Sequence, residues 1–111
     1  MVVCKEKIAS LKVGTGKIAG IRCSAIEINE HPDIEAALKT LEDELVVFEP
    51  EPGMGVTVVG SDPMLVSYAV VKLIDRRLPF VAVSNDEGSA LVAHSRTRRI
   101  EAGKSFKFQI I

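Results

Sequence analysis

The sequence predicts an α+β fold: a ferredoxin-like βαββαβ two-layer sandwich over about residues 18–84, with an additional strand at each end. Apolar runs typical of strands occur at 18–28, 45–48, 56–59 and 80–83. Two segments with helical spacing separate these runs in the order strand, helix, strand, strand, helix, strand. This order places both helices on one face of an antiparallel sheet, and the 111 residues are expected to form a single domain.

The N-terminal third predicts two strands. Residues 9–13 alternate between apolar and polar side chains, and residues 14–16 carry two glycines that indicate a turn. Residues 18–28 then predict a long strand. Its apolar parity changes near residues 24–26, which indicates a bulge or bend.

The first helix is expected to begin within residues 29–33. Pro32 suits the first helical position, and Asp33 and Glu35 suit the first turn, where the helix dipole favours anions. Residues 42–44 are acidic and lie near the C-terminal end, where the dipole disfavours them. We therefore expect a cation from another element to meet that end.

The residue pattern of the second predicted helix, residues 63–77, indicates an association surface. Asp62 suits its N-cap and Pro63 its first position. Its apolar residues surround the helix, although a thin two-layer domain covers only one helix face. We therefore expect a homo-oligomer with this helix at or near the interface, through Met64, Leu65, Tyr68 and Val71.

The C-terminal third predicts a strand at 80–83, a hairpin turn at 85–88 and a return strand at 90–93. A charged connection follows at 96–104. Phe106, Phe108 and Ile110 alternate with polar residues and predict a closing strand with one buried face.

Composition indicates a folded globular protein, with 47% hydrophobic and 26% charged residues. The net charge of −1 excludes an overall field that attracts nucleic acid or membranes. No signal-peptide pattern is present, and the apolar stretch 64–74 is too short to span a bilayer, so a cytoplasmic location is expected. Cys4 and Cys23 are expected to be reduced, buried thiols.

Two sets of residues are candidates for ligand binding. Polar residues at the predicted strand-to-helix turns form the first set: Asn29, His31, Asp33, Ser61 and Asp62. The second set is a trio of arginines that suits a small anion: Arg96, Arg98 and Arg99. In an extended segment two of these arginines share a side, although a solvated charged loop is the simpler interpretation.

No catalytic, metal or cofactor motif is recognised. Residues 14–17 share part of a phosphate-binding loop, but Ile18 stands where that motif needs Ser or Thr. The predicted element order is similar to that of small-molecule-sensing ACT-type domains and of shell-forming βαββαβ domains. We therefore expect a homo-oligomeric binding, regulatory or assembly module. The alternatives are a small enzyme with a site between subunits and, less favoured, a nucleic-acid binder using the basic C-terminal segment.

Overall fold

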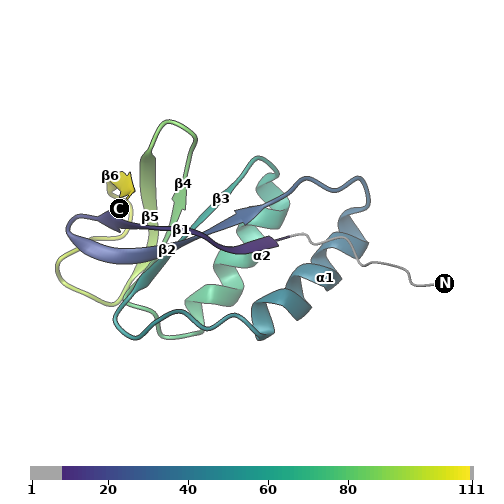
Figure 1. Cartoon of the computed structure of the whole chain (residues 1–111), viewed down its shortest axis with the longest axis horizontal. Helices are drawn as coiled ribbons and strands as arrows, with labels where there is room; N and C mark the ends of the chain where they lie inside the picture. The colour runs from purple at the N-terminus through teal and green to yellow at the C-terminus, as the bar shows by residue number, and fades with distance from the viewer. Residues whose placement is uncertain (1–8, 111) are drawn as a thin grey trace.

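The computed structural model describes residues 9–110, in which six strands form a closed β-barrel with two helices against one side (Figure 1). The strands follow one another around the barrel in chain order, and the first pairs with the last. The elements are β1 (Ala9–Ile18), β2 (Ile21–Ile28), α1 (Ile34–Val46), β3 (Gly55–Gly60), α2 (Pro63–Ile74), β4 (Phe80–Ser84), β5 (Ser89–Ser95) and β6 (Ser105–Ile110).

The centre of the fold is a βαβαβ unit. Strands β2, β3 and β4 are parallel neighbours, and α1 and α2 are the crossovers between them. The remaining strands pair in antiparallel fashion and complete the barrel. Since the central strands are parallel, their carboxyl ends meet at one end of the barrel, and the loops that follow them share that end.

The predicted ferredoxin-like βαββαβ sandwich is wrong, because residues 45–48 do not form a strand. Helix α1 continues to Val46, and Leu45 occupies its buried face. A short continuous apolar run suits either a buried strand or the end of a buried helix, and periodicity alone does not separate them. Without that strand, each helix connects parallel neighbours, and the similarity in element order to ACT-type and shell-forming domains no longer holds.

The N-terminal hairpin also differs from the prediction. Its turn is formed by Ala19 and Gly20, both with positive φ (49° and 81°), while residues 14–16 lie within β1. Gly16 is required for packing instead, because a Cβ there would overlap the ring of Phe108. The register irregularity lies between Ser10 and Gly14 of β1, opposite Glu27 and Ala25 of β2, so it occurs beside the predicted position but the extra residues belong to β1.

Apolar residues of β2 change from odd to even positions along the strand because both faces of the strand are buried. Cys23 belongs to the cluster inside the barrel, whereas Ile26 and Ile28 pack against the helices. The helix-facing cluster joins both helices to the outer faces of β2, β3 and β4. Its fully buried members include Leu41, Leu65 and Leu73.

The interior of the barrel is filled by a smaller cluster from β1, β2, β4, β5, β6 and the loop before β6. Phe80 is its largest fully buried side chain, and its ring occupies the space that a Cβ on Gly55 would take. Phe106 and Phe108 of β6 are half-buried against the same cluster. The predicted closing strand is therefore confirmed as β6, with the alternation seen at residues 105–109, and the hairpin of β4 and β5 is confirmed as well.

Local signals position both helices correctly at their N-termini. The Asp62 carboxylate accepts hydrogen bonds from the backbone N–H groups of Met64 and Leu65, and Pro63 is the first helical residue. At α1 the N-cap is Asp33, so Pro32 precedes the cap and does not occupy the first helical position.

The expected cation at the C-terminal end of α1 is Arg76. Its guanidinium donates a 2.6 Å hydrogen bond to the carbonyl of Leu45 in the last turn of the helix, which also accepts a 3.2 Å hydrogen bond from the backbone N–H of Phe48. The bond links the C-terminal ends of the two helices, which lie side by side (Figure 1).

Helix α2 buries more of its circumference within the chain than expected. It packs against the sheet and α1, which leaves Met64 58% and Val71 61% exposed and Tyr68 half-buried. Within residues 9–110 neither helix has the length and apolarity that a membrane-spanning helix needs. Cys23 is a buried free thiol, and Cys4 lies outside the described residues.

Candidate functional site

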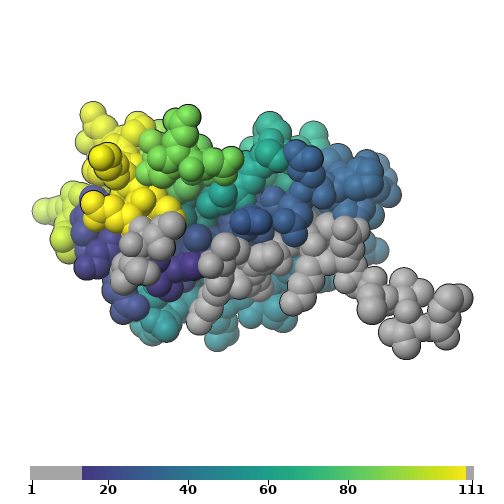
Figure 2. All heavy atoms as spheres, turned by 45° about the horizontal axis from the view of Figure 1, so that its top comes forward, coloured from purple at the N-terminus to yellow at the C-terminus, as the bar shows by residue number. Residues whose placement is uncertain are grey.

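A pocket of about 430 Å³ opens at the carboxyl ends of the three parallel strands; we call it the barrel-mouth pocket. Figure 2 shows that the green segment around residue 85 adjoins teal and blue segments of the chain on the face turned to the viewer. The lining residues are Glu27, Ile28, Asn29, Glu30, Val59, Gly60, Ser61, Ser84, Asn85 and Asp86.

The inner wall of the pocket is one row of side chains across the parallel strands. Glu27 of β2 is in register with Val59 of β3, which is in register with Ser84 of β4. Alternate residues of a strand share a face, so this row lies on the same face as Cys23 and Phe80, which belong to the barrel interior. The pocket is therefore the mouth of the barrel.

A pair of buried hydroxyls forms the inner end of this wall. Thr57 is fully buried one row deeper, and its Oγ1 lies 2.5 Å from Oγ of Ser84. The contact satisfies both hydroxyls inside the barrel, where an unpaired polar group would be costly. Ser84 is the one member of the pair that also lines the pocket.

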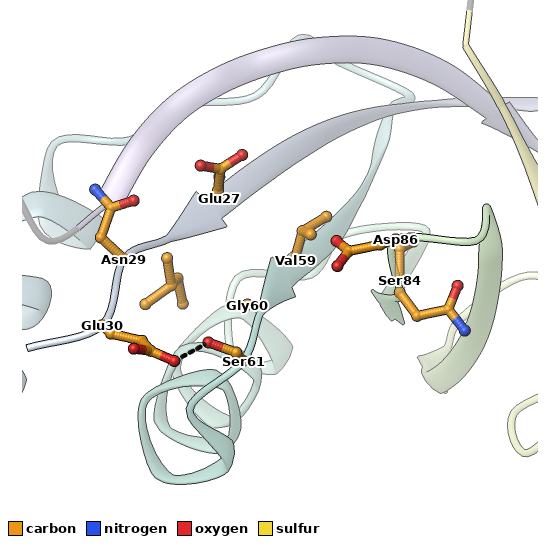
Figure 3. A pocket seen from close by; sticks show the side chains of 10 residues that line it. Glu27, Asn29, Glu30, Val59, Gly60, Ser61, Ser84 and Asp86 are labelled. Atoms are coloured by element: carbon orange, nitrogen blue, oxygen red, sulfur yellow. Dashed lines mark hydrogen bonds between the residues drawn. The ribbon is translucent and has the colours of Figure 1, made fainter.

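The rim comes from the loops that follow the strands. Figure 3 shows Asn29 and Glu30 at the end of β2 and Asp86 beyond the end of β4, with Ser61 after β3 between them. The Ser61 hydroxyl donates a 2.6 Å hydrogen bond to Glu30, and this contact joins two of the loops. Asn85 accepts hydrogen bonds from two backbone N–H groups of its own turn.

A neighbouring hollow of about 440 Å³ is lined by Glu30, His31, Pro32 and Asp62. The backbone N–H of Asp33 donates to Nδ1 of His31 at 3.0 Å, and Asp33 and Asp62 cap the two helices. The structure thus brings all five polar residues predicted at the strand-to-helix turns to one end of the barrel. Two of them, Asn29 and Ser61, line the barrel-mouth pocket itself.

The predicted arginine trio lies at the opposite end. The backbone N–H of Arg96 donates to the carbonyl of Pro79, just before β4 begins. Arg98 and Arg99 follow in a segment of bends and turns, not in the extended segment assumed for a shared face. All three side chains are exposed, and none lines the barrel-mouth pocket.

Five residues of the pocket that sequence reasoning missed carry most of its polarity: Glu27, Glu30, Ser84, Asn85 and Asp86. The sequence does contain a signal for Glu27. This charged residue lies four positions after Cys23, so both side chains are on the inward-facing side of the strand. Asp86 and Asn85 read as ordinary turn residues. Their place beside β2 and β3 depends on the parallel pairing, which the sequence did not indicate.

The pocket is electrostatically one-sided. Glu27, Glu30 and Asp86 supply three carboxylates, and the lining contains no Lys, Arg or His. Over the part of the chain that the structure describes, no three His, Cys, Asp or Glu side chains converge as a metal-ligand set. The arrangement offers hydrogen-bond acceptors and negative charge to a ligand.

Comparison of the sequence with protein-family models and with curated proteins finds no match.

Proposed function

We propose that the chain is a small binding module without catalytic activity of its own, and that the barrel-mouth pocket holds a small polar molecule bearing a positive charge. The observation that carries the proposal is the position of this pocket at the carboxyl ends of β2, β3 and β4. In α/β sheets with parallel strands, ligands bind beyond the carboxyl ends, where loops from successive strands converge.

The lining supports a cationic class of ligand. Glu27 of β2 and Asp86 after β4 supply carboxylates from the strands on either side of β3, and Asn29 and Ser84 add neutral polar groups. A primary amine or similar donor-rich cation would find acceptors on several sides, with charge-assisted hydrogen bonds as the strongest contacts. The three carboxylates repel a small anion, so the anion considered from the sequence is not proposed for this pocket.

Thermal-shift measurements with a panel of small primary amines, and with carboxylic acids of matched size as controls, test the proposal. A ligand that binds only the folded chain raises the melting temperature in a concentration-dependent way. Glu27→Gln is expected to remove the shift. Glu35→Gln is the matched control, because Glu35 is exposed on α1 and does not line the pocket. No shift with any amine, or an equal shift in both variants, would contradict the proposal.

Nucleic-acid binding by the basic segment is not favoured. Phe106 and Phe108 of β6 pack against the barrel interior, and Tyr68 lies on α2 beside Lys72. Their rings are therefore not arranged as a platform for stacking bases.

A further inference from the structure

The helical layer carries most of the exposed large apolar side chains of the described residues. Five large apolar side chains in the described part of the chain are more than half exposed. Four of them, Val46, Val47, Met64 and Val71, lie on or directly after the helices, and the fifth, Leu91, lies on β5. Grouped exposed apolar residues indicate an interaction surface, whereas scattered ones do not.

A groove of about 300 Å³ runs between the two helices within this surface, lined by Glu42, Leu45, Val46, Lys72 and Arg76. An ion pair crosses it, with Lys72 Nζ 3.8 Å from Glu42 Oε1. The same ammonium lies 5.4 Å from the centre of the Tyr68 ring. The groove therefore has an acidic wall on α1, a basic wall on α2 and apolar side chains beside both.

The charge of the two walls continues along α1 and around the C-terminal end of α2. On α1, acidic residues outnumber the single cation, Lys39. On α2 and the turn that follows it, Lys72, Arg76 and Arg77 outnumber Asp75. A surface with one acidic half and one basic half has the charge pattern that a two-fold symmetric contact between identical chains requires.

We propose that this face binds a second copy of the same chain. A two-fold axis that runs along the groove, in the plane between the copies, places α2 of one copy over α1 of the other. Lys72 of each copy then lies over Glu42 of the other, and four alternating charges surround the axis. Val71 and Val46 are brought into the contact beside them. An axis across the groove would instead place like charges together.

The mass of the chain in solution is the first test. At micromolar concentration, analytical ultracentrifugation is expected to give twice the 12.0 kDa chain mass. Val71→Asp is expected to reduce this to a single chain mass, with the circular dichroism spectrum unchanged because the position is exposed. Leu91→Asp is the matched control, since it adds the same charge at an exposed apolar position on the barrel, and it is expected to keep the double mass.

Charge reversal tests the pairing itself. Lys72→Glu and Glu42→Lys each place like charges around the axis, so each variant alone is expected to sediment as a single chain. An equimolar mixture restores two opposite-charge contacts across the interface and is expected to return to the double mass. A wild-type single-chain mass, Val71→Asp with the double mass, or a mixture that stays at the single-chain mass would each overturn the proposed interface.

Discussion

Replacement of Gly55 by alanine tests the packing of the barrel interior. Gly55 lies at the start of β3, and the ring of Phe80 occupies the space that its Cβ would need. Overpacking of a filled core costs about 1–3 kcal/mol. Alanine recovers at most about 1 kcal/mol of the backbone entropy that glycine loses on folding. We therefore expect Gly55→Ala to lower the free energy of unfolding by about 1–2 kcal/mol.

Gly14→Ala is the matched control, because Gly14 also lies in a strand and a Cβ there would meet no atom within 4 Å. Its free energy of unfolding is expected to stay within about 0.5 kcal/mol of the wild type or to rise slightly. The assay is urea unfolding followed by far-ultraviolet circular dichroism, since the chain contains no Trp.

A double variant shows whether Phe80 is the cause. Phe80→Leu alone shortens a buried side chain and is expected to cost about 1.5 kcal/mol. In the Gly55→Ala background it also removes the clash, so the two effects are expected to fall short of additivity by about 1 kcal/mol. Equal stabilities for the Gly55 and Gly14 variants, or strictly additive effects in the double variant, would refute the reasoning.

Three further predictions concern a buried hydroxyl pair, a hydrogen bond at a helix end and a buried thiol, and each is tested by urea unfolding. Ser84→Ala leaves the buried Thr57 hydroxyl without its partner and is expected to cost about 1–3 kcal/mol, whereas adding Thr57→Val is expected to recover part of that loss. Arg76→Met removes the hydrogen bond to the end of α1 and is expected to cost about 1 kcal/mol. Burial raises the pKa of the Cys23 thiol from 9.0 to about 12. Since the unfolded thiol ionises at the lower pH, stability is expected to fall as pH rises across that interval, and to fall less steeply in Cys23→Ala.

Features determined by nearest neighbours were predictable. Asp62 followed by Pro63 marks the start of α2, and the turn after β4 is marked by residues 85–88. Both are short-range arrangements, in which a side chain or a glycine satisfies a local backbone requirement. The five polar residues at the strand-to-helix turns lie at one end of the barrel for the same reason, because each follows a strand and precedes a helix.

Features that depend on distant partners were not predictable. Residues 45–48 are apolar whether they continue a helix or form a strand, and only packing against the sheet decides between these outcomes. Gly16 reads as a turn residue until Phe108 is known to lie against it. Asp86 joins the pocket only because β4 is the parallel neighbour of β3, and this neighbour relation depends on the strand order of the whole sheet and not on the residues of the turn.

The pairing of β1 with β6 has a consequence for biosynthesis. Ile18 is in register with Phe108, so this contact joins residues separated by nearly the whole described chain. Loop-closure entropy makes such distant pairing slow to form. The βαβαβ unit ends at Ser84 and leaves the ribosome before β6, and until β6 pairs, β1 and β5 are unpaired edges of the nascent sheet. Chaperone contact is therefore most valuable before β6 closes the barrel.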